Sequence, residues 1–262
     1  MTDGGAAFAP VVRCAMLVTC FTRPAMRKIP VTVYDLETVP DLAAVARIHG
    51  LEGRPEAEVL AALGEGFPKP MLHSIACIGA LNAAWVDGHW QVMSLGAPHV
   101  GQRSEGELIA GFMGMINKDT PTLVSFNGSG FDLPVLRYRA MVHGVPAPGL
   151  QRRNYFYRFG DSSVDLCDVL SSYGASTKVK LDELARTLGL PGKPDGMEGS
   201  QVAAYVREGR VAEVAAYCES DVVNTYRIWL RHELFRGELS PEALAQSEAH
   251  LEALLERRRT RP

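Results

Sequence analysis

The segment 31–37, Val-Thr-Val-Tyr-Asp-Leu-Glu, constrains the chain most, because a β-branched run that should form a buried strand carries two carboxylates near its end. Side chains two residues apart on a strand share one face, about 7 Å apart, so Asp35 and Glu37 point the same way. Such a pair needs compensation from a cation or from hydrogen-bond donors. A divalent metal ion is the simplest compensator, although an isolated Asp-x-Glu is more often a helix cap or a surface pair.

The composition describes an ordinary globular protein of 262 residues, 47% hydrophobic and 22% charged. This length allows one substantial α/β domain, or at most two small ones. The net charge of -3 neither supports nor excludes a nucleic-acid partner. The five cysteines are odd in number and form no Cys-x-x-Cys pair, which suits a reducing cytosol and argues against a structural zinc site. We therefore expect a cytoplasmic location.

Strands and helices alternate along the chain. Strands are predicted at 31–37, 74–81, 89–95, 121–126 and 163–166, and helices at 42–49, 56–63, 105–117, 131–143, 181–188, 201–208, 211–234 and 241–259. Asp87-Gly88 is a strong hairpin signal, so the first three strands should form an antiparallel meander. Pro40 is expected to end the first strand.

Two further segments place carboxylates near strand or helix ends. Asp132 follows a predicted strand and the turn Asn-Gly-Ser-Gly, and it falls in a first helical turn, where the helix dipole also favours an acid. Tyr217 and Asp221 are four apart on a late helix and lie on one face. Carboxylates that converge from three such elements can hold two divalent ions about 3.5 to 4 Å apart, which bind both the attacking and the departing oxygen of a phosphodiester.

These motifs, taken in order, resemble those of the DEDDy 3′→5′ exonucleases. The matching segments are Asp35-x-Glu37, the run from Asn127 to Asp132, and Tyr217-x-x-x-Asp221. Within that group the chain is most similar to the stand-alone bacterial proteins related to the proofreading domain of family B DNA polymerases. The resemblance covers about residues 29–234 and implies an RNase H-like α/β fold, a five-stranded mixed sheet flanked by helices.

The resemblance also implies a set of site residues. Two Mg²⁺ or Mn²⁺ ions would be held by four ligands, Asp35, Glu37, Asp132 and Asp221. Tyr217 would orient the attacking water. Asn127 and Phe131 match positions that contact the terminal nucleotide.

Basic residues outside the motifs are possible phosphate contacts. Arg152, Arg153 and Arg158 interleave with aromatic residues, a pattern that fits either a nucleic-acid contact or a partly buried linker. Lys193 lies in a loop rich in turn formers, where a solvated lysine is the commoner outcome.

We therefore predict a metal-dependent 3′→5′ exonuclease that acts on the 3′ end of single-stranded nucleic acid and releases 5′-mononucleotides. DNA is the expected substrate. An exoribonuclease with the same site is the alternative. A non-catalytic nucleic-acid-binding module is a third hypothesis, against which the intact carboxylates speak. Residues 28–236 would form the exonuclease domain, 1–27 a disordered leader that is no membrane helix, and 237–262 a C-terminal helical extension.

Overall fold

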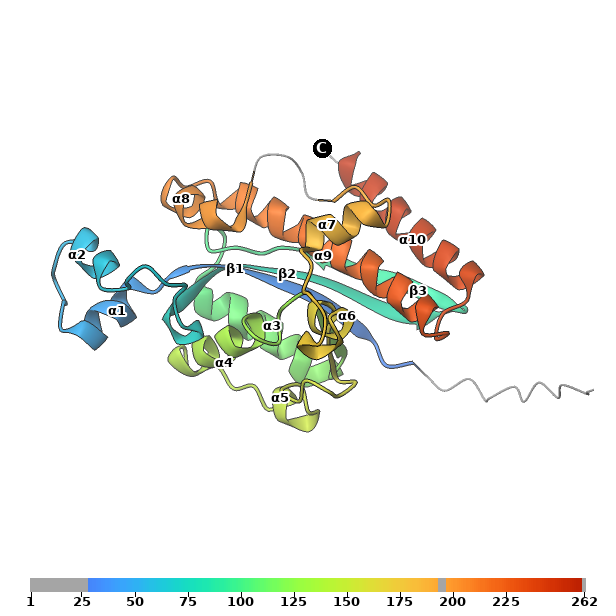
Figure 1. Cartoon of the computed structure of the whole chain (residues 1–262), viewed down its shortest axis with the longest axis horizontal. Coiled ribbons are helices and arrows are strands. Elements are labelled where there is room, and N and C mark those ends of the chain that lie inside the picture. The colour runs from blue at the N-terminus through green and yellow to red at the C-terminus, as the bar shows by residue number, and fades with distance from the viewer. Residues whose placement is uncertain (1–27, 193–196, 261–262) are drawn as a thin grey trace, which may run out of the picture.

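The structure is a computed structural model that describes residues 28–192 and 197–260 (Figure 1). The hypotheses about the leader 1–27 and about Lys193 fall outside these residues. Among the described helices, none combines the length and the apolar character needed to cross a membrane.

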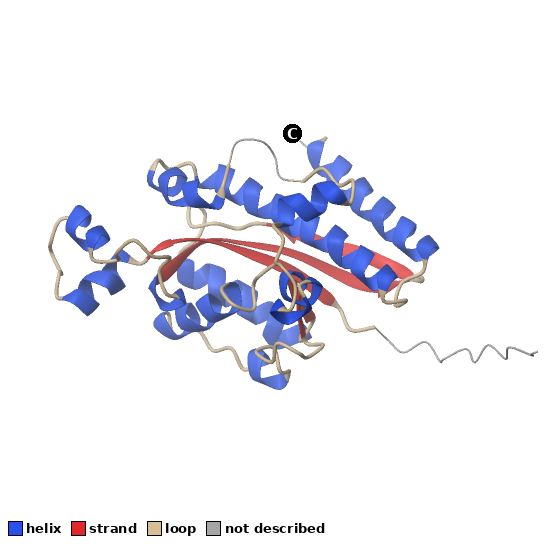
Figure 2. Cartoon of the chain, in the orientation of Figure 1, coloured by secondary structure: helices blue, strands red, loops and turns tan. Residues whose placement is uncertain are grey.

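A five-stranded mixed sheet with strand order β3-β2-β1-β4-β5 forms the centre of the molecule (Figure 2). Its strands are β1 (Val31–Pro40), β2 (His73–Val86), β3 (His89–Gly96), β4 (Thr122–Ser125) and β5 (Ser163–Asp165). The first three form an antiparallel meander, while β4 runs parallel to β1 and β5 parallel to β4. The predicted fold class, the sheet type and the meander are confirmed.

Helices cover both faces of the sheet (Figure 1). One face carries α3 (Glu105–Asp119), α4 (Asp132–Val142) and α5 (Gly149–Arg152), and the other carries α7 (Leu181–Thr187), α8 (Val202–Arg207), α9 (Val211–Phe235) and α10 (Pro241–Arg259). The remaining helices are α6 (Leu166–Leu170), directly after β5, and α1 (Leu42–His49) and α2 (Glu56–Ala61), which project beyond the end of β1.

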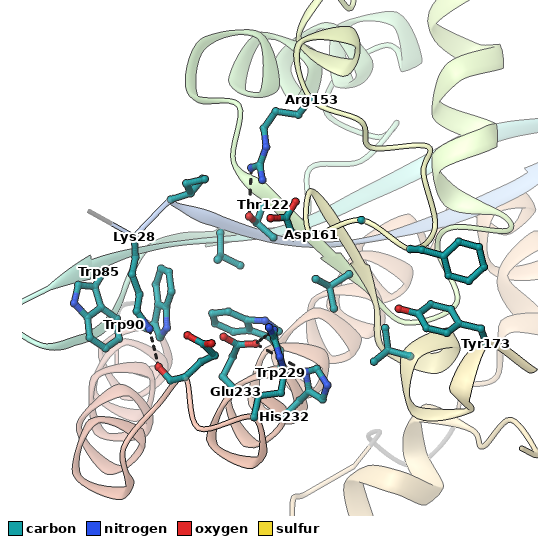
Figure 3. A pocket seen from close by; sticks show the side chains of 18 residues that line it. Lys28, Trp85, Trp90, Thr122, Arg153, Asp161, Tyr173, Trp229, His232 and Glu233 are labelled. Atoms are coloured by element: carbon teal, nitrogen blue, oxygen red, sulfur yellow. Dashed lines mark hydrogen bonds and ion pairs between the residues drawn. The ribbon is translucent and has the colours of Figure 1, made fainter. Parts of the chain in front are cut away.

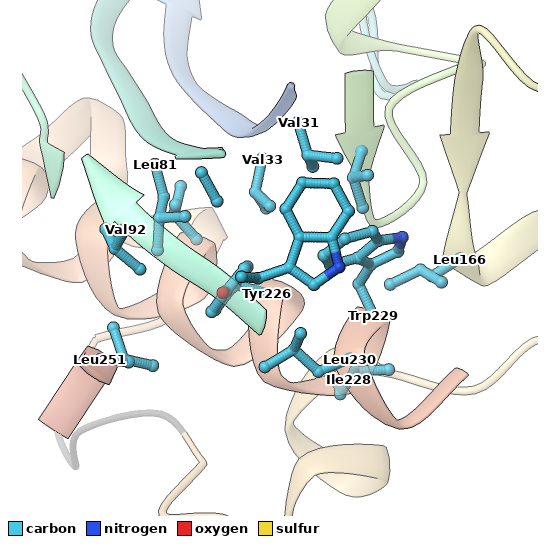
Figure 4. Close-up of a cluster of buried hydrophobic side chains, with 14 of the residues drawn as sticks. Val31, Val33, Leu81, Val92, Leu166, Tyr226, Ile228, Trp229, Leu230 and Leu251 are labelled. Atoms are coloured by element: carbon cyan, nitrogen blue, oxygen red, sulfur yellow. The ribbon is translucent and has the colours of Figure 1, made fainter. Parts of the chain in front are cut away.

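Each face of the sheet buries its own apolar cluster, as the alternation of side chains along a strand requires. Toward α9, Val33 and Leu81 pack with Tyr226 and Trp229 (Figure 4). Toward α3, the neighbouring Tyr34 packs against Phe112. Adjacent residues of β1 therefore serve opposite cores, which fixes the register of the strand.

Local signals in the sequence explain where several elements begin and end. The β2–β3 turn uses Asp87 and Gly88, both with positive φ, as a two-residue hairpin of this twist requires. Ser104 and Glu107 form a capping box at the start of α3, since each side chain accepts the other's backbone N–H.

The first strand is longer than the sequence analysis predicts. It ends at Pro40, as expected, yet it is paired with β2 over its whole length and with β4 only from Val31 to Val33. Asp35 and Glu37 therefore lie inside β1, where the neighbouring β4 has already ended. The correction matters because beyond Val33 the backbone of β1 is not paired with β4 and can bond to another element.

The last helix covers the edge of the meander. The Trp90 N–H of β3 donates to Ser247 Oγ at 3.0 Å, and the Val92 N–H donates to His250 Nδ1 at 3.1 Å. Leu251 is fully buried in the same cluster as α9. Because α10 occupies the backbone donors of β3, it shields this strand from edge-to-edge pairing.

A buried arginine connects the helical hairpin α1–α2 to the sheet and to α3. Arg139 of α4 is 4% exposed; its Nη1 lies 2.5 Å from Asp41, the cap of α1, and its Nη2 lies 2.5 Å from Glu105 of α3. Burial alone would raise the pKa of both carboxyls, but hydrogen bonds outweigh it. Those from Ala44 N–H and Arg139 lower the pKa of Asp41, and those from Arg139, Ile75 N–H and His143 lower that of Glu105.

Replacing this arginine is expected to destabilise the fold. Arg139→Met should reduce the free energy of unfolding by about 3 to 5 kcal/mol at pH 7, because two buried carboxylates lose their cation. Groups whose folded pKa is lowered stabilise the protein above their unfolded pKa, and that stability is lost as pH falls. The difference between variant and wild type should therefore shrink below about pH 4.

Urea unfolding monitored by circular dichroism at several pH values measures this effect. Arg137→Met is the matched control, since Arg137 lies on the exposed face of the same helix with its guanidinium carbon 3.9 Å from the Phe156 ring centroid. A loss below about 1 kcal/mol is expected there. Equal losses in both variants would contradict a special role for Arg139.

Candidate active site

Asp35 and Glu37 project from β1 toward α9. Asp35 pairs with Gly79 in β2, and Glu37 pairs with Cys77. Asp35 is partly buried and Glu37 is 8% exposed. The predicted common orientation of the two acids thus agrees with the alternation in β1, and the face they share is the one that α9 covers.

Asp132 approaches the same strand from the first turn of α4. Its Oδ1 accepts a hydrogen bond from the Leu36 N–H at 2.9 Å, and the residue is 6% exposed. Leu36 stands between the two acids of β1, beyond the point where β4 stops pairing. The carboxylate of Asp132 therefore takes a backbone donor of β1 that β4 is too short to reach.

The late helix α9 comes close to Asp35 of β1 because the neighbouring strand β2 has no side chain at residue 79. A Cβ atom on Gly79 would lie 2.7 Å from Cys218 Sγ and 2.9 Å from Val222 Cγ2. In the space left free, Cys218 Sγ lies 3.5 Å from Asp35 Oδ2. Asp221, 5% exposed, follows Cys218 by three residues on the same helix.

The carboxylates of these elements act on one another electrostatically. Burial raises the pKa of Asp35 well above its ordinary value, and nearby negative charges raise it further. In order of effect these are Asp132, Glu37 and Asp221. Burial also raises the pKa of Asp132 to about 7, although hydrogen bonds from the N–H groups of Leu36 and of Asp132 itself oppose the rise. The arrangement therefore favours a cation among the carboxylates.

The donor atoms suit a hard divalent cation. Asp35, Glu37 and Cys218 each offer one possible ligand atom, and these three atoms lie within 4.8 Å of one another. The hydrogen bond with Cys77, then burial and the charge of Asp35, raise the pKa of the Cys218 thiol well above its ordinary value. The sulfur thus stays protonated and donates to Asp35, which leaves carboxylate oxygens, the ligands that Mg²⁺ and Mn²⁺ prefer.

Tyr217 lies on α9 one turn before Asp221, as the spacing predicts. Its side chain is 6% exposed, so the ring packs within the protein beside the acidic helix face. This placement is compatible with the water-orienting role inferred from the resemblance.

A carboxylate missed by the sequence analysis fixes the turn before Asp132. Asp165, at the end of β5, accepts the Asn127 N–H at 2.7 Å and the Ser129 N–H at 3.0 Å. Asn127 has a φ of 69°, which a turn held in this way can maintain. No local pattern marks this role, because Asp165 meets Asn127 and Ser129 across 38 and 36 residues of chain.

Two of the residues predicted to contact substrate, Asn127 and Phe131, flank this turn. Asn127 accepts a hydrogen bond through Oδ1 from Lys178 Nζ at 3.3 Å. Phe131, the residue before Asp132, packs edge-on against His73 with ring centroids 4.8 Å apart. Lys178 was also missed, and no local pattern marks it, since it lies in a loop 51 residues from its partner.

Of the three arginines proposed from their basic and aromatic neighbourhood, Arg152 and Arg153 lie away from the acids. Arg152 donates to the Asn117 carbonyl of α3, and Arg153 donates to the Thr120 carbonyl at the start of β4, the end opposite the acids. Arg153 lines a cavity of about 900 Å³ there (Figure 3). The Arg158 guanidinium forms a bidentate ion pair with the Asp168 carboxylate, and both N–O distances are 2.7 Å. The structure therefore does not support Arg152 or Arg153 as phosphate contacts.

The RNase H-like sheet and the cluster of acids beside its central strand are features of the class of 3′→5′ exonucleases. The chain belongs to the family of predicted 3′-5′ exonucleases related to the exonuclease domain of PolB, whose family model matches residues 65–262. The resemblance drawn from the motifs is thereby confirmed. Asp35 and Glu37 precede the matched region, so their assignment depends on the motif and on their geometry.

A curated relative agrees with the family. A DNA polymerase of Archaeoglobus fulgidus is 29% identical over 132 residues, which is 47% of this chain and 17% of the polymerase. The similar region thus spans less than a fifth of the polymerase.

A methyl group at residue 79 is expected to disturb the site. Gly79→Ala should lower exonuclease activity at least tenfold and stability by about 1 to 3 kcal/mol, because the added Cβ forces α9 away from β1. Gly96→Ala is the control, since nothing lies within 4 Å of that position. Removing the thiol as well, in Gly79→Ala with Cys218→Ala, should recover part of both losses. An active and stable Gly79→Ala protein would contradict the close approach.

Proposed function

We propose that this protein removes nucleotides one at a time from the 3′ end of single-stranded DNA. The proposal rests above all on the geometry of the acids: Asp132 of α4 accepts the N–H of Leu36, which stands between Asp35 and Glu37, and these two acids offer ligand atoms within 4.8 Å of each other and of Cys218 on α9. The charges of Asp132 and Asp221 also raise the pKa of Asp35. Acids from three separate elements held this close match the demand of a two-metal phosphodiester site.

In this proposal two Mg²⁺ or Mn²⁺ ions are bound by Asp35, Glu37, Asp132 and Asp221. When bound, the ions would lower the pKa of the attacking water and stabilise charge on the departing 3′ oxygen. Asp35 and Glu37 would supply ligands from β1, Asp132 from α4 and Asp221 from α9. The thiol of Cys218, 3.5 Å from Asp35 Oδ2, would restrict how that carboxylate turns.

The remaining roles fall to residues around the acids. Tyr217 would hold the attacking water through its hydroxyl. Asn127 and Phe131 would contact the terminal nucleotide, with Lys178, beside Asn127, available for a phosphate. Lys193 stays a proposed phosphate contact.

The direct test uses a 5′-labelled oligonucleotide with Mn²⁺. A ladder that shortens from the 3′ end is expected, faster on DNA than on RNA of the same sequence. A faster RNA ladder would make the protein an exoribonuclease with the same site. Binding without cleavage would favour a non-catalytic nucleic-acid-binding module.

Neutralising one acid should separate activity from stability. Asp35→Asn is expected to lower cleavage at least a thousandfold, because a carboxylate ligand on which the other three acids converge is lost. In EDTA the variant should melt at or above the wild-type temperature, since a repulsive charge has been removed. Added Mn²⁺ should raise the melting temperature of the wild type and not of the variant.

Asp161→Asn is the matched control, because Asp161 is exposed and lines the cavity at the other end of the sheet. It should cleave and respond to Mn²⁺ as the wild type does. Full activity in the Asp35 variant would refute the proposed ligand.

Removing the hydroxyl of Tyr217 should change kcat without changing the response of the melting temperature to Mn²⁺. Tyr217→Phe should lower kcat about a hundredfold, the lower end of the range for a side chain that assists proton transfer. The Mn²⁺-induced rise in melting temperature should stay as in the wild type. A parallel loss of Mn²⁺ response would instead make Tyr217 part of the metal site.

A further inference from the structure

Three aromatic rings form a cluster beside the acids. Phe67, in the loop after α2, lies 5.1 Å from His73 and 5.2 Å from Phe131, measured between ring centroids. His73 is 4% exposed and Phe131 is partly buried, whereas Phe67 is 77% exposed. The aromatic cluster therefore has a buried base and one ring open to solvent.

Hydrogen bonds hold the loop that carries Phe67. His73 Nε2 lies 3.1 Å from the Pro68 carbonyl, and His73 Nδ1 lies 2.9 Å from Thr38 Oγ1. A carbonyl only accepts, so Nε2 carries the proton, and Nδ1 accepts from the threonine hydroxyl. The neutral imidazole thus fixes the residue that follows Phe67 to β1.

The aromatic cluster adjoins two elements that bear acids. Thr38, bonded to His73, directly follows Glu37 in β1, and Phe131 directly precedes Asp132. An isolated exposed phenylalanine is common on protein surfaces and does not by itself indicate a binding site. Here the ring is held by a buried histidine, and its neighbour in the aromatic cluster is the residue next to an acid of the site.

We propose that Phe67 stacks on the base of the 3′-terminal nucleotide, with Phe131 beside it. This inference rests on the exonuclease function proposed above. Aromatic rings bind every base through its π-face, without sequence preference. A base inside a duplex is paired and stacked on its neighbours, so only an unpaired end can place its terminal base on the ring. Phe67 would therefore select single-stranded or frayed 3′ ends.

The test combines a side-chain deletion with a base deletion. Wild type, Phe67→Ala and Phe67→Tyr are assayed on an oligonucleotide with a normal 3′ nucleotide and on one that ends in a tetrahydrofuran residue, which has no base. On the normal end Phe67→Ala should raise KM about fivefold or more, the lower limit for one base–aromatic stack, and Phe67→Tyr should restore it. On the baseless end wild type and Phe67→Ala should be equal.

Phe235→Ala is the matched control, because Phe235 is 85% exposed at the end of α9. It should behave as the wild type on both ends. A Phe67→Ala defect of equal size on the normal and the baseless end would show a purely structural role and overturn the proposal, as would the absence of any defect.

A binding measurement keeps this inference separate from the proposed activity. The DNA carries 2-aminopurine as its 3′-terminal base and a phosphorothioate in its last linkage, which slows cleavage. Stacking on Phe67 should quench the fluorescence with wild type and much less with Phe67→Ala; equal quenching would overturn the stacking. If the wild type shortened no 3′ end, the exonuclease proposal would fail, while the quenching would still decide the role of Phe67.

Discussion

The hydrogen bond from the Leu36 N–H to Asp132 fixes the site to the fold. It exists because β4 is short: the fourth strand stops pairing at Val33, and β1 continues with one side open. Through this bond α4 is placed beside the two acids of β1, and its first residue takes the position that the backbone of a longer β4 would fill. The turn before α4 is held in its own way, by the two backbone donors that Asp165 accepts.

The gathering of negative charge has a structural counterpart in the packing of α9 on the same face of the sheet. Carboxylates repel one another, so the fold must hold them together through contacts that do not depend on their charge. Gly79 lets α9 come close, and the apolar cluster around Tyr226 and Trp229 keeps the helix on the sheet. The free energy of core packing thus offsets electrostatic repulsion at the site, and bound cations would relieve it.

Much of this architecture could be predicted from the sequence, and the exceptions share a cause. Period-two alternation gave the orientation of Asp35 and Glu37, and helical spacing placed Tyr217 one turn before Asp221. Asp165 and Lys178 were missed because each meets its partners across 36 to 51 residues of chain, contacts that no local pattern records. For Arg152 and Arg153 the sequence left a nucleic-acid contact and a partly buried linker open, because basic and aromatic composition does not tell where side chains point. Both side chains donate hydrogen bonds to carbonyl groups just before the start of β4, at the end of the strand away from the acids.

Because Gly79 has no side chain, substitutions at this residue would change the distance between the sheet and α9. Asp35 and Asp221 belong to opposite sides of this layer, and Gly79 stands directly across from Asp35. Side chains of increasing volume at that one position would move α9, and Asp221 with it, away from Asp35 in steps while the chemical identity of every acid stays unchanged. A series of substitutions at residue 79 would thus measure how much separation between its ligands a two-metal site of this kind tolerates. It would also show whether a smaller or a larger cation is preferred as the distance between the ligands increases.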